Sequence, residues 1–129
     1  MTLAEQGMGN GEDLSALHDV TRVRALLIDA ATARQALSYA QALGRLGLRF
    51  TRPRMQSLCR TLDAIDAEGA ARGEPGLAVL VVRESDGLPG QGWWTHRTHY
   101  RGAWTGPQAA RYVTRLQRAA YARWAGTRN

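Results

Sequence analysis

The sequence predicts a mostly α-helical domain with one small β-hairpin. Apolar residues recur at three- and four-residue steps in three separate stretches, which is the period of a helix that packs on one side. One apolar, β-branched run and the turn-forming residues that follow it predict the hairpin. The chain has 129 residues, enough for a single core. We therefore expect a disordered start over residues 1–12 and one domain over residues 13–129.

The first predicted helix runs from Asp13 to about Thr32. Its apolar residues follow the helical period, and they are Leu14, Leu17, Val20, Val23, Leu26, Leu27 and Ala30. Glu12 and Asp13 suit the positive N-terminal end of the helix dipole. We interpret the segment as a packing helix, and His18 beside its apolar stripe as a structural residue rather than a metal ligand.

Residues 38–62 predict a helix, a turn and a second helix. Ser38 is suited to cap the first helix and Thr51 the second, because a hydroxyl can accept a hydrogen bond from the unpaired N–H groups there. Glycines at positions 44 and 47 end the first helix, and Pro53 fits the first turn of the second. The segment therefore has the order of a helix-turn-helix.

The second of these helices has an apolar side and a basic side. The apolar stripe consists of Met55, Leu58, Leu62 and Ile65. The other side carries Arg52, Arg54, Gln56 and Arg60. Such a helix suits docking on DNA, because arginine can hold phosphates and read guanine edges. A surface helix on a basic protein that binds no DNA is the alternative.

An apolar run and a turn follow this helix. The run is Leu-Ala-Val-Leu-Val-Val at residues 77–82, which predicts a buried strand, and residues 85–90, Ser-Asp-Gly-Leu-Pro-Gly, are dense in turn formers. A second short strand over residues 91–94 would complete a hairpin over residues 77–94. A helix, a helix-turn-helix and a hairpin, in that order, predict a winged helix-turn-helix domain in which the hairpin is the wing.

The last third of the chain mixes aromatic and basic residues. Between positions 93 and 104 stand Trp93, Trp94, His96, Arg97, His99, Tyr100, Arg101 and Trp104. Such residues can stack on bases and pair with phosphates, or they can fill the core, which we favour for Trp93 and Trp94. A helix over residues 105–125 follows, and we expect its apolar stripe to pack on the first helix. Its arginines could extend a phosphate-binding surface or frame a protein partner.

Charge is segregated along the chain. All 17 basic residues are arginines, which is typical of a GC-rich genome. Two stretches, residues 30–62 and 87–129, contain 13 of these 17 arginines and no carboxylate side chain. Segregation of this kind favours a polyanion as the partner. A solvated basic surface without a partner is the alternative.

Residues 37–94 resemble the DNA-binding domain of alkylguanine-DNA alkyltransferases and alkyltransferase-like proteins. Ser-Tyr-Ala-Gln-Ala-Leu at residues 38–43 is similar to the family's Ser/Thr-Tyr-Gly-Gln/Glu-Leu-Ala. Leu-Cys-Arg-Thr-Leu at 58–62 is similar to its Val-Gly-x-Ala-Leu, and Asp-Gly-Leu-Pro-Gly at 86–90 to its glycine turn. The resemblance implies a winged helix-turn-helix that reads DNA mainly through the minor groove. It also implies that Tyr39 contacts the phosphate beside a flipped base.

The same segment lacks the reactive motif of that family. Pro-Cys-His-Arg, or Pro-Trp/Ala-His-Arg in alkyltransferase-like proteins, would fall near residues 77–82, where neither cysteine nor histidine is present. Gln56 takes the position of the arginine that displaces the base, with Arg54 and Arg60 nearby. We therefore expect no alkyl transfer.

Other residues suited to catalysis are few. Cys59 has no histidine near it in sequence, so we interpret it as a structural thiol. His96 and His99 lack the third side chain that a metal site would need. Asp63 and Asp66 are interpreted as solvated residues of their helix. The sequence thus predicts no catalytic residue, no metal and no cofactor.

The sequence also bears on location. No run approaches the roughly 20 apolar residues of a membrane span, and the N-terminus lacks the pattern of a secretion signal. The single cysteine cannot form an internal disulfide. We expect a cytoplasmic bacterial protein that has no membrane partner.

Together these observations predict a non-catalytic protein that binds double-stranded DNA, as a transcriptional regulator or a phage- or mobile-element-associated factor. The residues expected to contact DNA are Ser38, Tyr39, Arg49, Arg52, Arg54, Gln56, Arg60, Arg97 and Arg101. The main alternative is a protein-interaction adaptor that uses the aromatic, basic C-terminal helix. A further alternative is a damaged-base recognition protein that keeps the alkyltransferase-like scaffold without its chemistry.

Overall fold

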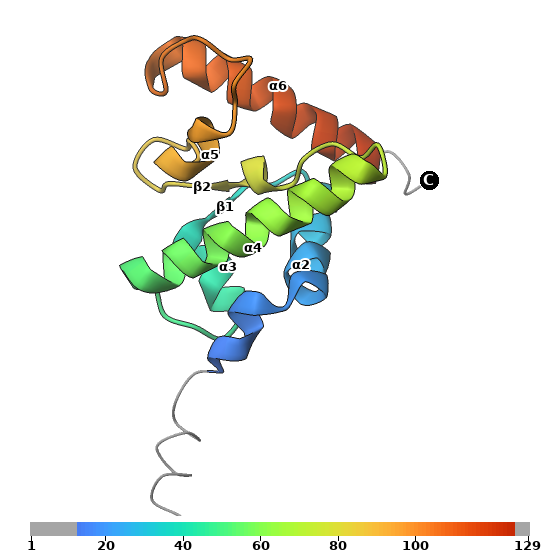
Figure 1. The fold of residues 1–129 in the computed structure, drawn as a ribbon, viewed down its shortest axis with the longest axis vertical. Helices are drawn as coiled ribbons and strands as arrows, with labels where there is room; N and C mark the ends of the chain where they lie inside the picture. The colour runs from blue at the N-terminus through green and yellow to red at the C-terminus, as the bar shows by residue number, and fades with distance from the viewer. Residues whose placement is uncertain (1–12, 126–129) are drawn as a thin grey trace, which may run out of the picture.

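The computed structural model of the chain describes residues 13–125, so the expectation for residues 1–12 lies outside the described part. In chain order the elements are the 3-10 helix η1 (Leu14–His18), α2 (Val20–Thr32), β1 (Leu37–Ser38), α3 (Tyr39–Arg45), α4 (Arg52–Ala71), the 3-10 helix η2 (Ala78–Leu80), β2 (Val81–Val82), α5 (Gln91–Thr95) and α6 (Gly106–Ala125) (Figure 1). The described chain is mostly helical, with one small parallel sheet of two strands.

The helix predicted over residues 13–32 is divided in two. η1 ends at His18 and α2 begins at Val20, with Asp19 between them in an extended conformation. The Asp19 carboxylate accepts a hydrogen bond from the backbone N–H of Arg22 at 3.0 Å. A capping residue has non-helical backbone angles, so the helix is interrupted at Asp19. The apolar period of the sequence continues across Asp19, which is why one unbroken helix was predicted.

α3 and α4 begin as the sequence predicts, although Gly44 lies within α3 and does not end it. Ser38 Oγ accepts a hydrogen bond from the Gln41 N–H at 3.0 Å, and the Ser38 N–H donates to Gln41 Oε1 at 2.8 Å, which is a capping box. Thr51 Oγ1 caps α4 by accepting from the Arg54 N–H at 3.2 Å. Gly47, with φ at +79°, allows the chain to reverse between the two helices.

The predicted hairpin over residues 77–94 is wrong. β2 pairs in parallel with β1, with Leu37 opposite Val81, and residues 91–94 belong to α5. Parallel strands need a long crossover, which α3 and α4 supply together. Trp93 and Trp94 account for the helix in place of the second strand. Neighbouring side chains of a strand point to opposite faces, so a strand here would direct the two indole rings to opposite sides. On the short helix α5, both tryptophans are buried.

Asp66 fixes the path of the chain after α4. Its Oδ1 accepts hydrogen bonds from the backbone N–H groups of Leu77 at 2.7 Å and Ala78 at 3.1 Å. Burial raises the pKa of this carboxyl, although the two hydrogen bonds and Arg97 act in the opposite direction. A Cβ at Gly76 would lie only 2.8 Å from Asp66 Oδ2. The interpretation of Asp66 as a solvated residue is therefore wrong, since it holds the start of η2.

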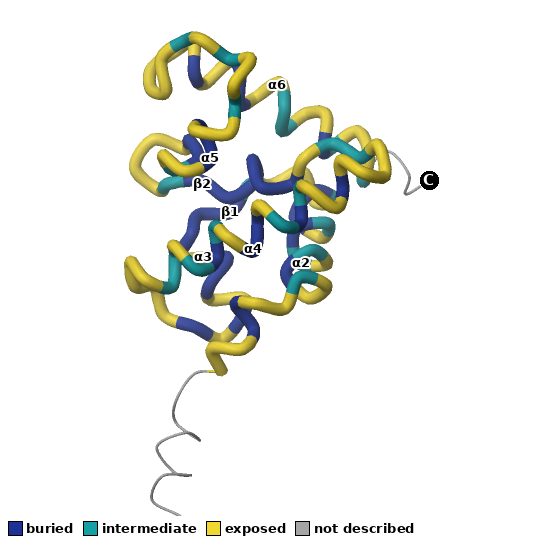
Figure 2. The backbone as a smooth tube through the Cα atoms, in the orientation of Figure 1, coloured by how far each residue is buried: buried dark blue, intermediate teal, exposed yellow. Residues whose placement is uncertain are grey.

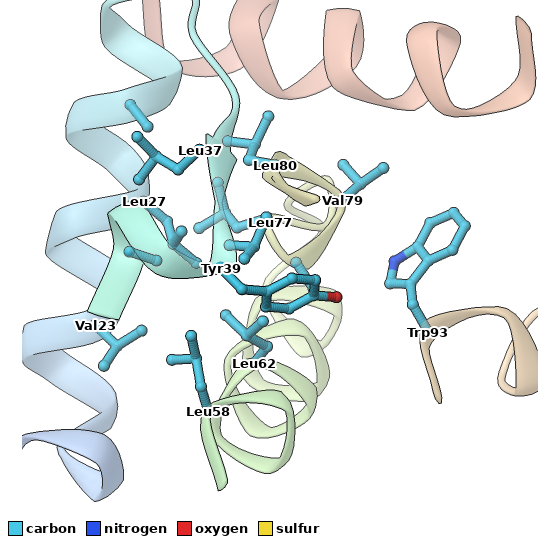
Figure 3. Packing of buried hydrophobic residues seen from close by; sticks show 14 of the residues in the cluster. Val23, Leu27, Leu37, Tyr39, Leu58, Leu62, Leu77, Val79, Leu80 and Trp93 are labelled. Atoms are coloured by element: carbon cyan, nitrogen blue, oxygen red, sulfur yellow. The ribbon is translucent and has the colours of Figure 1, made fainter. Parts of the chain in front are cut away.

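One hydrophobic core joins all the elements. Fully buried side chains at its centre come from α2, α3, α4, η2 and β2, and they are Leu27, Leu43, Leu58, Leu80 and Val81. Figure 2 shows that the sheet and the inner sides of the helices are buried, whereas the outer sides of α4 and α6 are largely exposed. In Figure 3, side chains of α2, α4 and η2 point toward one another around Tyr39. The sheet therefore lies inside the molecule.

Trp93 and Trp94 fill the core, as favoured from the sequence. They are 7% and 2% exposed, and their rings meet edge to face with centroids 4.8 Å apart. Trp94 also lies against Tyr100 and Tyr112, with centroid distances of 5.3 and 6.0 Å. Its indole N–H donates to the Pro89 carbonyl at 3.1 Å. An aromatic cluster thus joins α5 to α6.

The C-terminal helix is confirmed, and its apolar stripe faces the core. The buried residues of α6 are Ala109, Tyr112, Val113 and Ala120. α6 packs on α2, the first long helix, and on η2. Gln117 Nε2 adds a hydrogen bond to the Val79 carbonyl at 3.0 Å. Among the helices described, none is both long and apolar enough to cross a membrane.

Candidate nucleic-acid interface

An open groove of about 760 Å³ lies between the N-terminal half of α4 and the loop that follows β2. Its walls come from residues 38–40, residues 50–59, residues 83–85 and residues 90–92. Four of the nine predicted contact residues line it, namely Ser38, Tyr39, Arg52 and Gln56. The fold therefore brings part of the predicted site together.

Tyr39 lies in the floor of this groove and is 5% exposed. Its hydroxyl accepts a hydrogen bond from the Gly90 N–H at 2.9 Å and lies near the Cys59 thiol. Burial, reinforced by Cys59, raises the pKa of Tyr39 to about 12. A Cβ at Gly90 would lie 3.1 Å from this hydroxyl. The phenol therefore connects α3 with α5, and Ser38 is similarly engaged in its capping box.

Arg52, Gln56 and Arg60 share one outward side of α4. They recur at four-residue steps, and all three are exposed. The Arg60 guanidinium donates to Ser57 Oγ at 3.1 Å, which keeps it along the helix. The next charged residue of α4 is the exposed Asp63. The basic part of this side is therefore confined to the first half of the helix.

Arg54 and Arg49 are joined to each other in the turn before α4. Arg54 Nη1 donates to the Arg49 carbonyl at 3.0 Å, and Arg54 is half-buried. This contact holds the loop that connects α3 to α4. Both residues remain at the same end of α4 as Arg52, although the Arg54 guanidinium turns toward the loop.

Arg97 and Arg101 lie outside the groove. The Arg97 guanidinium stacks on the Trp93 ring at 4.2 Å from its centroid and lies 4.0 Å from Asp66 Oδ2. Its side chain is 24% exposed. Arg101 is exposed in the segment between α5 and α6. Arg97 thus has a structural role that its position in a basic, aromatic stretch did not reveal.

Several groove residues were not expected from the sequence to contact DNA, and Phe50, Gln91 and Arg83 are among them. Phe50 is 50% exposed at the groove wall, and Gln91 is exposed at the start of α5. Arg83 lines the opposite wall and pairs with Asp86, with Nη2 and Oδ2 2.8 Å apart. The one phenylalanine of the chain stands outside any helical period, between two predicted helices. That isolation was the signal that could have identified it as a surface residue.

His96 and His99 have separate partners. His96 Nδ1 lies 3.1 Å from the Gly92 carbonyl oxygen, and His99 Nε2 lies 3.1 Å from the Tyr112 hydroxyl. Over residues 13–125, no three histidine, cysteine, aspartate or glutamate side chains are grouped so that they could hold a metal ion. The contacts of both histidines are explained by packing.

Cys59 is half-buried and lines the groove. Burial raises the pKa of its thiol, which disfavours the nucleophilic thiolate. We expect Cys59→Ala to lower the free energy of unfolding by roughly 1 kcal/mol, the usual scale of a small truncation, without affecting binding of duplex DNA. Denaturant unfolding and a duplex titration measure the two effects. Loss of duplex binding by a folded Cys59→Ala protein would show that the thiol has more than a structural role.

The resemblance to alkyltransferase-like proteins rests on the short motifs at residues 38–43, 58–62 and 86–90. Comparison of the chain with protein-family models, with curated proteins and with solved structures gave no match.

Proposed function

We propose that this protein binds double-stranded DNA without catalysis, and that α3 and α4 act as its helix-turn-helix. The observation that carries the proposal is the outward side of α4, where Arg52, Gln56 and Arg60 are exposed and no carboxylate occurs before Asp63. In Figure 1 this end of α4 projects beyond the body of the molecule. This end of α4 is therefore placed where a duplex could reach it.

Arginines two helical turns apart suit the phosphate backbone. The eight residues from Arg52 to Arg60 correspond to a rise of about 12 Å, so the two guanidinium groups can reach different phosphates. Gln56 lies between them and has both a donor and an acceptor for a base edge. Phe50, half exposed beside Arg52, offers an apolar ring that could lie against a sugar or between bases. The four residues together form what we call the α4 surface.

The turn at residues 83–90 takes the part of a wing in this proposal. The Arg83 N–H donates to the Leu88 carbonyl at 2.8 Å, and the Asp86 carboxylate accepts from the Leu88 N–H at 3.1 Å. The turn is thus closed without a hairpin, and its first residues line the groove that α4 also lines. Binding of this kind suits a transcriptional regulator or a phage- or mobile-element-associated factor.

The test is a comparison of two double variants that each remove two positive charges. We expect Arg52→Gln/Arg60→Gln to weaken binding of a random-sequence duplex. It should also flatten the slope of log affinity against log salt concentration by about two units, since each phosphate contact contributes about 0.9. Fluorescence anisotropy at several salt concentrations gives both quantities.

The control is Arg22→Gln/Arg34→Gln, because both arginines are exposed and lie outside the groove. It should retain the affinity and the slope of the natural chain. Equal slopes for the two double variants would contradict the placement of α4 against DNA. Arg54 is a poorer choice for this test, since its contact with Arg49 would confuse binding with stability.

Recognition of a damaged base is a second candidate, favoured by the groove itself. The groove lies directly beside the α4 surface and is lined by Tyr39, Met55 and Cys59, so an unstacked base could enter it from a bound duplex. This function predicts tighter binding to a duplex with one alkylated guanine than to the matched undamaged duplex. Equal affinities would leave undamaged DNA as the ligand.

The adaptor alternative has less support from the fold. The apolar stripe of α6 is covered by α2 and η2 within the same chain. The side that α6 leaves exposed is rich in arginine, and not in the apolar anchors that dominate most protein interfaces.

A further inference from the structure

The outer side of α6 has a row of three arginines. Arg111, Arg115 and Arg118 are exposed and recur at steps of four and three residues, so they lie along one side of the helix. Together with Ala110 and Thr114 they line a shallow depression of about 520 Å³. The Arg115 guanidinium lies 5.3 Å from the centroid of the Tyr112 ring, which supports it from below. We call Arg111, Arg115 and Arg118 the α6 row.

The charge of the α6 row is not neutralised by the described residues. None of its three arginines forms an ion pair with residues 13–125. The sequence contains no aspartate or glutamate after Asp86. Glu74, which does pair with α6 through Arg123, is shared with Arg24 and Arg72 at the other end of the helix. The α6 row therefore presents three positive charges to solvent.

The α6 row and the α4 surface face different directions. The buried stripe of α6 packs toward η2, and the row lies on the opposite side of the helix. Figures 1 and 3 show η2 and the sheet between α6 and α4. A straight duplex held against the α4 surface would thus leave the α6 row free.

We propose that the α6 row binds the sugar-phosphate backbone of a second nucleic-acid duplex segment, so that one protein molecule bridges two segments. The inference rests on the proposed function for the first segment. Arg111 and Arg118 are about 10 Å apart along the helix axis, which corresponds to roughly three base-pair steps of a duplex. Two or three phosphates of one strand can therefore be contacted together.

The composition of the row favours phosphates over other anionic partners. A membrane surface would be expected to receive apolar side chains beside the arginines, but the other residues that line the depression are Ala110 and Thr114. An acidic protein would need aromatic or aliphatic anchors for a stable interface, and α6 directs those inward. A duplex backbone needs only charge and donors along a line.

The test is energy transfer between a donor-labelled and an acceptor-labelled random duplex mixed with the full-length chain. We expect the natural protein to bring the two duplexes together. Arg111→Gln/Arg118→Gln should weaken this bridging roughly tenfold, as expected for the loss of two charge-assisted phosphate contacts, while a single duplex still binds. Arg115 is left in place because it packs on Tyr112. Arg22→Gln/Arg34→Gln is the charge-matched control and should bridge as the natural chain does.

Other outcomes separate the two proposals. Equal bridging by Arg111→Gln/Arg118→Gln and by the control would overturn the role of the α6 row and leave the α4 surface unaffected. If the α6 variant lost all duplex binding while Arg52→Gln/Arg60→Gln lost none, the proposed function of α4 would be wrong and the α6 row would be the DNA-binding surface. If the α6 variant lost binding to phosphatidylserine vesicles but kept normal bridging, the row would be a membrane contact and the inference would be wrong.

Discussion

Replacement of Trp94 by alanine should lower the free energy of unfolding by about 4 kcal/mol, within the range of large aromatic truncations in a core. Trp94 is 2% exposed and contacts Trp93, Tyr100 and Tyr112. Removal of the indole would leave a cavity between α5 and α6 and would also free the Pro89 carbonyl. This is the largest effect that we expect from a single substitution.

Trp94→Phe is the matched control for this change. It keeps an aromatic ring but loses the hydrogen bond to Pro89, so its cost should be clearly smaller. Chemical denaturation followed by circular dichroism measures both variants. A Trp94→Ala protein as stable as the natural chain would contradict the placement of this side chain in the core.

Asp66→Ala should cost about 2 to 3 kcal/mol, because it leaves two buried backbone N–H groups without their acceptor. Asp66→Asn should cost much less. Both hydrogen bonds, from Leu77 and Ala78, are accepted by Oδ1, and an asparagine side chain can place its carbonyl oxygen there. Thermal unfolding of the two variants tests this difference. Equal losses would show that the charge of Asp66, and not its acceptor oxygen, holds η2.

The free energy of unfolding of the natural chain and that of Asp66→Asn should depend differently on pH. Burial raises the pKa of Asp66 above its ordinary value of 3.8, so the folded chain binds this proton more tightly than the unfolded chain. The carboxyl should thus add stability as the pH falls through the raised pKa toward 3.8. Asp66→Asn lacks this proton. The stability of Asp66→Asn relative to the natural chain should therefore be highest at neutral pH and should decline as the pH falls toward 3.8. A stability difference that stays constant with pH would contradict the raised pKa.

Local signals predicted α3, α4 and α6 well, but not the break at Asp19 or the short helix α5. Ser38 and Thr51 cap the helices for which they were assigned, and the apolar periods of α4 and α6 face the core as expected. Such features are encoded within a few residues of one another, so they can be recognised along the chain. The strand pairing was not encoded in this way. β2 lies beside β1, more than 40 positions earlier, and no local pattern indicates a partner at that distance.

The candidate site was predicted in part for the same reason. Arg52, Gln56 and Arg60 share a side of α4 because helical spacing determines it. The opposite wall, with Arg83, reaches the groove only through the fold. Arg97 and Asp66 show the limit of this reasoning. Each is of a type that is usually exposed, but tertiary contacts partly bury both. Residue type and spacing therefore identify an exposed helix side more reliably than an isolated charged residue.

The most direct test of DNA binding by α4 is a titration of the isotope-labelled chain with a random-sequence duplex, followed by backbone amide NMR. The largest shift changes should occur over residues 50–60, which include the α4 surface, with little change over residues 63–71 of the same helix. The second range is an internal control, because it begins at Asp63 and carries the acidic part of α4. Changes confined to residues outside 50–60, or no changes at a saturating duplex concentration, would contradict the proposal that α4 binds DNA.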